Sequence, residues 1–334
     1  MFTIKESEFL EWQTYIEKCQ KINILQYWQY GAAKERSSNW KVIRFIISDD
    51  EGKVVAISQF LTRTFPIIGG IARMNRGPLL LRNLDLDHEQ AENIALNVVK
   101  ALLKEAKSRR WWLIQIAPEI LDGEGARKYL ESIGLKKIPI TPSASGLLSL
   151  ESNEDALMKS LKGKWRNCLR KGLKLGVSIT KKEGTSEELV TLLKSYHNLQ
   201  NDKGFSGLSD DLITALAQQE GENWQFTLYI ANDELNQNIN ESIGMLVGIR
   251  HGDTVTYMIG YTNDVGRKLQ ANNVLLWSAI LHSKEIGCKW FDIGGLNAST
   301  PQGIAHFKQG VNSELYSLIG EWRGLTLPWI GNVK

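Results

Sequence analysis

The sequence has few of the residues that mark secreted, metal-binding or membrane-spanning proteins. Its three cysteines, Cys19, Cys168 and Cys288, lie more than a hundred residues apart and form no CxxC pair, so neither a disulfide framework nor a cysteine zinc site is predicted. Five scattered histidines show no HxH or HExxH spacing, and no metal site is expected. No apolar run approaches the length of a membrane span, and the N-terminus MFTIKESEFLEW is amphipathic rather than signal-like, which predicts a cytoplasmic protein.

The common short signatures of catalysis are also absent. There is no GxSxG nucleophile elbow, no GxxxxGK[ST] phosphate loop and no strand-GxGxxG-helix fingerprint. Hydrolases of the elbow type, P-loop NTPases and dinucleotide enzymes are therefore disfavoured. No bound cofactor is predicted.

The length and charge distribution suggest two domains with one basic segment. At 334 residues the chain can form two domains of ordinary size. The net charge is only +3, but the residues from Lys159 to Lys182 include nine Lys or Arg and no Asp or Glu. This segment predicts a local field that attracts anions.

The order of predicted elements occurs twice along the chain. In each half, three strand-like runs are followed by a long helix and a further strand, a β-β-β-α-β unit. The units consist of Val42–Ser48, Val54–Leu61, IARMNRGPLLL, the helix His88–Arg109 and WWLIQIAP, and then of Phe226–Ala231, Ile243–Arg250, TVTYMIGYTND, a helix at about Asn272–Ile286 and KWFDIGG.

Helices of this length between strands imply a sheet with crossover connections. Asp87 and Gln90 form a capping pair before the first helix, and Gly287 ends the second. We therefore predict an α/β (α+β) protein with two domains, each a mixed sheet with packed helices. The predicted domains are residues 1–150, which the C-terminal residues 318–334 could join, and residues 151–317.

A basic helix is predicted between the two halves. Ser152 with Asp155 can cap it, and its apolar side carries Leu157, Leu161, Trp165 and Leu169. Seven Lys or Arg between Lys159 and Lys174 lie largely on the other sides. A solvated face and a surface for anionic ligands are both consistent with this pattern, and the absence of acidic partners favours the ligand.

The repeated plan is similar to that of GNAT acyltransferases, which hold the pyrophosphate of an acyl-CoA on a glycine-rich loop before the long helix. The matching loop here, NDVGRKLQANN, has one glycine, Gly266, placed too early. Binding of CoA in the usual manner of that family is therefore not expected.

Six segments together resemble the Fem-type (FemAB-like) aminoacyltransferases, which build peptidoglycan bridges and consist of two tandem GNAT-like domains. They are LQYWQYGAAK (25–34), RGP (76–78), KWRNCLRKGLKLGVSI (164–179), KGF (203–205), FDIGG (291–295) and HFKQG (306–310). The likeness spans nearly the whole chain in the right order. Tyr30 replaces the tryptophan of the first motif, Val311 replaces a common phenylalanine, and the second half has no coiled-coil insertion.

The resemblance implies amide formation on a cell-wall or cell-envelope precursor. The donor would be an aminoacyl-tRNA, and the acceptor an amine on a nucleotide- or lipid-linked precursor, with peripheral membrane association as one option. Such aminolysis needs two aligned anionic substrates and positive charge near an oxyanion more than a nucleophilic side chain.

The resemblance also implies roles for individual residues. Lys308, with Phe307 beside it, matches the FK pair near the reacting carbonyl, and Asp292 could orient Lys308, act as a base or cap the backbone. Lys34 and Lys203 would contact the acceptor phosphate or uridyl group. Residues with further binding roles would be Tyr257 in the acceptor cleft, and Arg166 and Arg170 near the nucleic acid or pyrophosphate.

Two other functions are consistent with the residues. One is an N-acyltransferase that depends on acyl-CoA or an acyl carrier and modifies an amino sugar of a surface polysaccharide. The other is a pair of GNAT-like domains that binds RNA or an anionic glycan without chemistry. The absent CoA loop disfavours the first of these, and the retained Phe307–Lys308 pair disfavours the second.

Overall fold

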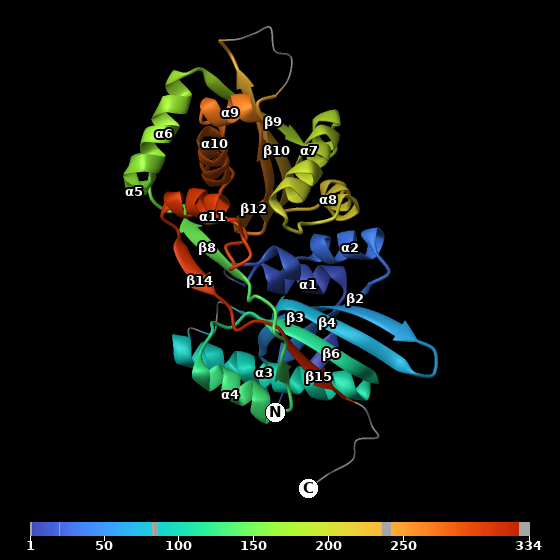
Figure 1. Cartoon of the computed structure of the whole chain (residues 1–334). Coiled ribbons are helices and arrows are strands. Elements are labelled where there is room, and N and C mark those ends of the chain that lie inside the picture. The colour runs from blue at the N-terminus through green and yellow to red at the C-terminus, as the bar shows by residue number, and fades with distance from the viewer. Residues whose placement is uncertain (1, 20, 82–83, 85, 236–241, 327–334) are drawn as a thin grey trace. The chain divides into compact units, whose positions relative to one another are not determined.

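The chain forms two compact units in a computed structural model (Figure 1). One unit contains residues 1–143 and 317–334, and the other contains residues 144–316. The structure describes residues 2–19, 21–81, 84, 86–235 and 242–326. Each unit is described by itself below.

The first unit is built on a mixed sheet with strand order β1-β2-β3-β4-β6-β15-β7, and β5 pairs with β3. Its strands are β1 (Thr3–Glu6), β2 (Lys41–Ser48), β3 (Val54–Phe65), β4 (Gly69–Gly77), β5 (Leu79–Leu80), β6 (Trp111–Pro118), β7 (Lys136–Lys137) and β15 (Trp322–Leu325). Its helices are α1 (Phe9–Ile16), η1 (Ile24–Gln26), α2 (Trp28–Ser37), α3 (His88–Ser108) and α4 (Glu124–Ser132).

Helix α3 forms where the sequence predicted the first long helix. The Asp87 side chain accepts from the Gln90 amide, and the Gln90 side chain accepts from the Asp87 amide, so the predicted capping box is present. Val98, Val99 and Leu102 are buried on one side of the helix and pack in a core with sheet residues. This apolar contact fixes α3 on the sheet, since burial of such side chains contributes about 1.5–3 kcal/mol each.

The second unit has the strand order β14-β8-β13-β12-β11-β10-β9. Its strands are β8 (Ala144–Ser149), β9 (Val177–Glu183), β10 (Trp224–Asp233), β11 (Gly244–His251), β12 (Thr254–Thr262), β13 (Trp290–Asp292) and β14 (Glu314–Ser317). Its helices are α5 (Glu154–Ser160), α6 (Gly163–Lys174), α7 (Glu187–Lys203), α8 (Asp210–Ala217), α9 (Asp264–Lys268), α10 (Ala271–Glu285), α11 (Gln302–Lys308) and η3 (Gln309–Val311).

The repeat predicted from the sequence is present in the topology. In each unit three antiparallel strands are followed by a long helix and a strand that pairs in parallel with the third: β4 with β6, and β12 with β13. A crossover helix is what such parallel pairing requires. The predicted mixed sheets with packed helices are therefore observed in both halves.

Helices cover both faces of the second sheet. Helix α10 packs against β9 to β12 and against α6, and Tyr229 of β10 lies in the same core as Trp277 of α10. Helix α7 packs against β12, and the next residue of β10, Ile230, lies against it with Leu192. Because alternate strand residues point to opposite faces, α7 and α10 lie on opposite sides of the sheet, as Figure 1 shows.

The basic helix predicted after residue 152 is interrupted in the structure. Asn153, not Ser152, caps α5 by accepting from the Ala156 amide. The helix then stops at Leu161, because the Lys162 amide donates to the Gly310 carbonyl at 3.0 Å instead of to its own helix, and α6 begins at Gly163. The predicted apolar side is nevertheless correct, since Leu157, Leu161, Trp165 and Leu169 are all buried in one core.

The unit boundary also lies earlier than the sequence suggested. We expected it after residue 150, but Ala144–Ser149 forms β8, which pairs with β13 in the second sheet.

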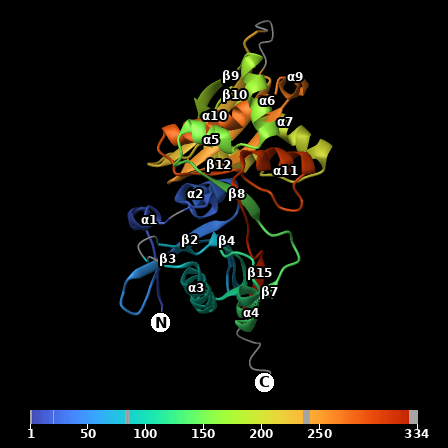
Figure 2. The same ribbon diagram turned by 90° about the vertical axis from the view of Figure 1, so that its left-hand side faces the viewer.

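Among the described residues, no helix combines the length and the apolar character that crossing a bilayer requires. Figure 2 shows the same elements from a second direction.

Candidate functional site

A cavity of about 470 Å³ lies in the second unit where β12 and β13 separate. The two strands pair in parallel only from Thr254 to Thr256, opposite Trp290 to Asp292. Beyond this point β12 continues, while the residues that follow β13 turn away from it. One edge of β12 therefore faces the cavity. The lining comes from β12, the residues after β13, α11 and the C-terminal part of α7: Tyr196, Leu199, Gly204, Phe205, Ser206, Tyr257, Met258, Ile259, Gly260, Gly295, Asn297, Ser299, Thr300, Pro301, Ile304 and Lys308.

Lys308 is a buried cation on the wall of this cavity, with only 6% of its surface exposed. Its Nζ lies 4.5 Å from the centre of the Tyr257 ring and donates to the Gly295 carbonyl at 3.4 Å. Burial lowers the pKa of Lys308 from 10.5 to about 8, and the nearby Asp292 carboxylate opposes part of this change. Most Lys308 side chains are therefore still protonated at neutral pH, but the charge is poorly solvated.

Asp292 holds the turn that separates the two strands. Its Oδ1 accepts from the Gly294 amide at 2.8 Å and from the Ser145 hydroxyl, and its Oδ2 accepts from the Tyr316 hydroxyl at 3.0 Å. Gly294 has φ of 72°, and a Cβ there would lie 2.4 Å from the Tyr257 carbonyl oxygen. Only glycine fits this close approach, so Gly294 of the FDIGG segment has a specific steric role.

Phe307 anchors the helix that carries Lys308. The Phe307 and Trp165 rings lie 6.0 Å apart between centroids, and both residues pack in the core of the second unit. Gly310 lies directly over the Trp165 ring, since a Cβ at this position would be 2.1 Å from its Cδ1. Adjacent residues of α11 thus have different tasks: Phe307 contacts the core and Lys308 faces the cavity.

A β-bulge in β12 lies at the cavity. Val247 of β11 pairs with Ile259, and Gly248 pairs with Tyr257, so Met258 is the extra residue. The backbone of a bulged residue leaves the regular hydrogen-bond ladder. Met258 lines the same cavity as Lys308.

The structure brings some of the predicted residues together and separates others. Tyr257 lies against Lys308 in the cavity, and burial raises the pKa of its hydroxyl. Arg166 and Arg170 lie on α6 and are not among the residues that line the cavity; Arg166 donates to the Lys159 carbonyl at 2.9 Å. Lys203 ends α7, next to the lining residue Gly204, and its side chain lies outside the described part of the structure.

Lys34 belongs to the first unit, where it lies in the last turn of α2 and is half-buried. Burial and the neighbouring cations Arg73 and Arg63 lower its pKa. An anion bound beside these cations would favour the charged form of Lys34.

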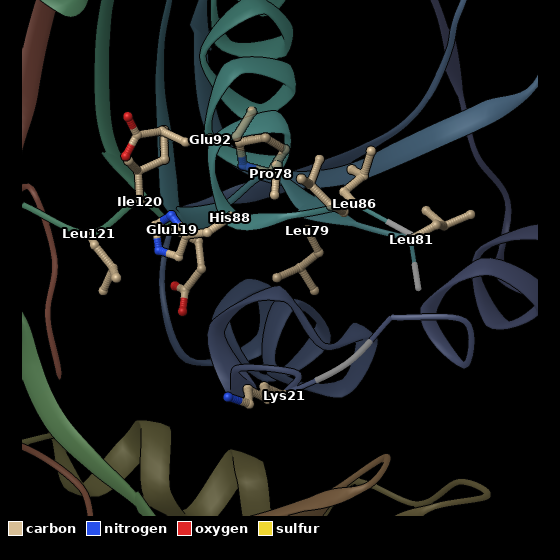
Figure 3. A pocket seen from close by; sticks show the side chains of 13 residues that line it. Lys21, Pro78, Leu79, Leu81, Leu86, His88, Glu92, Glu119, Ile120 and Leu121 are labelled. Atoms are coloured by element: carbon tan, nitrogen blue, oxygen red, sulfur yellow. The ribbon is translucent and has the colours of Figure 1, made fainter. Parts of the chain in front are cut away.

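The first unit has a cavity of about 490 Å³ after β4 and β6 and beside the start of α3 (Figure 3). It is lined by the crossover helix of its unit, whereas no residue of α10 is among those that line the Lys308 cavity. Leucines form much of its wall, and its polar residues are Lys21, His88, Glu92 and Glu119. The Glu119 carboxylate is paired with Arg76 at 2.7 Å. The two halves therefore differ in chemistry: an ammonium lies in the cavity of the second unit, whereas carboxylates, a lysine and a histidine surround leucines in the first.

Sequence reasoning missed several residues around Lys308. Tyr196 and Phe205 line the cavity with their rings 6.1 Å apart, and Ser145 and Tyr316 hold Asp292. Phe205 belongs to the KGF segment, but Tyr196, Ser145 and Tyr316 belong to none of the six segments, so only the fold reveals these three. Among the described residues, no cluster of His, Cys, Asp and Glu could hold a metal ion.

Comparisons with known proteins agree with this architecture. Residues 158–309 match the family model described as acetyltransferase (GNAT) domain. The crystal structure of FemX matches with a TM-score of 0.74 at 16% sequence identity, over 96% of this chain and 97% of that chain. A search of the curated proteins by sequence found no match.

Two further solved structures have the same fold. L-PGS from Bacillus licheniformis matches with a TM-score of 0.55 and 11% identity, over 98% of this chain and 94% of that one. A tandem GNAT protein from the clavulanic acid biosynthesis pathway matches with a TM-score of 0.52 and 9% identity, over 98% and 99%.

The second unit therefore contains a GNAT domain, and the whole chain has a tandem GNAT fold. More particularly, it is the fold of FemX, so the Fem-type resemblance predicted from six sequence segments is confirmed at the level of the fold.

The packing of Gly310 against Trp165, directly after the helix that contains Lys308, can be tested by substitution. Gly310→Ala places a methyl group against the buried Trp165 ring and should lower the free energy of unfolding by about 1–3 kcal/mol, a typical cost of overpacking. Gly303→Ala is the matched control, because nothing lies within 4 Å of a Cβ there. Urea unfolding of both variants measures the difference; equal stability would show that the Trp165 contact is not tight.

The burial of Lys308 generates a second prediction. Its pKa is lower in the folded state, about 8 against 10.5, so the unfolded chain binds more protons between these values and stability rises with pH there. Below about pH 8 the buried Lys308 ammonium lowers the free energy of unfolding by the full amount, roughly 3 kcal/mol for this difference in pKa.

Lys308→Met should therefore stabilise the protein at pH 7, with a gain that shrinks as the pH rises from 8 to 10. Urea unfolding of both proteins across this range measures the gain. A constant or negative difference would contradict a costly buried ammonium.

Proposed function

We propose that the chain is an acyltransferase that forms an amide on an amine of a cell-wall or cell-envelope precursor, with an aminoacyl-tRNA as donor. The observation that carries the proposal is the Lys308 ammonium, buried on the wall of a cavity between diverging parallel strands that the bulged residue Met258 also lines. We propose that the Met258 amide faces the same space. Both groups are hydrogen-bond donors. Together they suit a carbonyl oxygen that becomes negative during reaction.

In the proposed reaction the acceptor amine attacks the ester carbonyl carbon of the donor. A carbon–nitrogen bond forms, and the carbonyl oxygen becomes an oxyanion that the Lys308 ammonium and the bulge amide stabilise. The carbon–oxygen ester bond then breaks, and the proton lost by the amine ends on the departing oxygen. Lys308 keeps its proton throughout, so its role is electrostatic.

Asp292 and Phe307 act on this centre indirectly in the proposal. Both carboxylate oxygens of Asp292 already accept hydrogen bonds from Ser145, Gly294 and Tyr316. Asp292 therefore fixes the turn whose Gly295 carbonyl receives Lys308, and Phe307 fixes α11 on Trp165. Tyr257 limits where the Lys308 ammonium can lie, through its ring.

Two observations favour a tRNA donor over CoA. Between β12 and α10 the chain forms the short helix α9, whose first turn carries Asp264, where a pyrophosphate would need open backbone amides. Helix α6 has basic residues and no acidic ones, which suits the backbone of a nucleic acid. We propose that Arg166 and Arg170 attract the tRNA, and that Lys34 and Lys203 contact phosphates of the acceptor.

A second candidate is an acyl-CoA-dependent N-acyltransferase acting on an amino sugar. The tandem GNAT protein that matches over the full chain is described as a structure without AcCoA, which associates this fold with that donor. A third candidate is binding of RNA or an anionic glycan without chemistry. The buried lysine argues against it, because an unreactive surface gains nothing from a poorly solvated ammonium.

A donor and acceptor panel tests the proposal. The purified protein is incubated with charged tRNAs or acyl-CoAs and with muramyl-peptide or amino-sugar acceptors, and the product mass is read. We expect transfer from a charged tRNA. Transfer from acyl-CoA alone would favour the second candidate, and no transfer from any donor would favour the third.

Loss of the Lys308 charge should abolish most of the activity. Lys308→Met should reduce kcat about 10²–10³-fold, the usual effect of removing one oxyanion donor. In the unaltered protein kcat should fall as the pH rises through about 8, because Lys308 then loses its proton. Steady-state rates against pH test both statements, and near-normal turnover of Lys308→Met would remove this residue from the mechanism.

Charge reversal on α6 tests the tRNA contact. Arg166→Glu with Arg170→Glu should weaken tRNA binding and flatten its dependence on salt, since each phosphate contact contributes about 0.7–0.9 to the slope of log K against log salt concentration. Lys128→Glu on α4 of the first unit is the control, because this exposed lysine lies outside the basic helix. An unchanged salt slope would place the tRNA elsewhere.

A further inference from the structure

A second cavity, which we call the polar groove, lies under helix α7 in the second unit. It measures about 580 Å³ and is lined by Thr180, Lys182, Glu188, Thr191, Leu192, Ser195, Ile230, Asn232, Ser242, Met245, Tyr261 and Asn263. These residues come from β9, β10, the start of β11, the end of β12 and α7. Thr180, Ile230, Met245 and Tyr261 are direct partners across the four strands, so they form one row on the sheet face that α7 covers.

The polar groove is rich in hydrogen-bonding groups but has no net charge. Its lining includes the hydroxyl groups of Ser, Thr and Tyr and the amides of Asn. The one cation and the one anion among the described lining residues, Lys182 and Glu188, are paired with each other at 2.6 Å. A phosphate or carboxylate would therefore compete with an existing ion pair, which favours an uncharged ligand.

The floor of the groove is apolar. Leu192, Ile230 and Met245 are buried beneath the polar rim, and Tyr261 is half-buried at its edge. Neutral donors and acceptors around an apolar floor match a molecule with hydroxyl groups on its edges and C–H groups on its faces. A sugar ring has this distribution.

The polar groove adjoins the cavity that contains Lys308. Along β12, Ile259 lines the Lys308 cavity and Tyr261, two residues on and on the same face, lines the polar groove. Along α7, Ser195 lines the groove and Leu199, one turn further, lines the Lys308 cavity. The two cavities are therefore neighbours along both α7 and β12.

We propose that the polar groove is a subsite for an uncharged sugar ring, part of a substrate whose reacting group lies at Lys308. The link to Lys308 rests on the proposed function, whereas sugar binding itself does not. The ring could belong to the acceptor or be the terminal ribose of the donor. The terminal ribose of a tRNA carries a phosphate, which would need a cation beside it. Because the described lining has no unpaired cation, a sugar of the acceptor is favoured.

Binding is tested without catalysis by saturation-transfer NMR, with N-acetylglucosamine and ribose as probes and the full chain as receptor. We expect saturation to pass from the protein to the protons of a bound probe, and this signal to be lost in Asn232→Leu, which removes an amide, and in Ser195→Leu, which fills the groove. Asn198→Leu on the exposed side of α7 is the matched control and should bind normally. Urea unfolding verifies that each variant is folded.

Kinetics identify the source of the sugar. A muramyl peptide is compared with the same peptide lacking its sugar, and Asn232→Leu should raise KM for the first about tenfold while leaving KM for the second unchanged. A rise in KM for the donor would instead support a ribose in the same subsite.

Two results would overturn the proposal: no saturation transfer from the unaltered protein to either probe, or saturation transfer that persists in both groove variants. Failure of the proposed function appears differently. Sugar binding that is lost in the groove variants, retained in Lys308→Met and accompanied by no acyl transfer from any donor would support the subsite and reject the transferase.

Discussion

The site in the second unit depends on the early separation of two parallel strands. β12 and β13 pair over three residues, and then the Asp292 carboxylate draws the Gly294 amide back into a turn. Ser145 and Tyr316 hold the same carboxylate from β8 and β14, the strands at the edge of the sheet. Without this turn β13 could continue beside β12, and the space that receives Lys308 would close.

The burial of the Lys308 ammonium costs stability. An ammonium that is 6% exposed loses hydration, and its contacts with a tyrosine ring and one carbonyl restore only part of it. The packing of Phe307 and Gly310 against Trp165 helps to offset the remaining free-energy cost of burying the ammonium. An apolar side chain at position 308, such as methionine, would fill the same space without a charge and would be favoured by stability alone.

The two units share one topology, but the residues that line their cavities differ in chemistry. Both place a cavity next to the parallel strand pair, and both cover the sheet with a long helix. Leucines with acidic and basic neighbours line the first cavity, whereas the second is lined by a lysine, aromatic rings and uncharged polar residues. A repeat in topology therefore does not imply a repeat in chemistry.

The sequence alone determined the α/β class, the repeated unit and the long helices, and it drew attention to Lys308. These follow from local patterns: apolar periodicity for α3, the capping pair of Asp87 and Gln90, and the FK motif. The tertiary structure decided the rest, because it depends on contacts between distant residues. The Lys162 amide bonds to Gly310 and splits the basic helix, Ala144–Ser149 pairs with β13 rather than remaining in the first half, and Tyr196 of α7 meets Lys308 at one cavity.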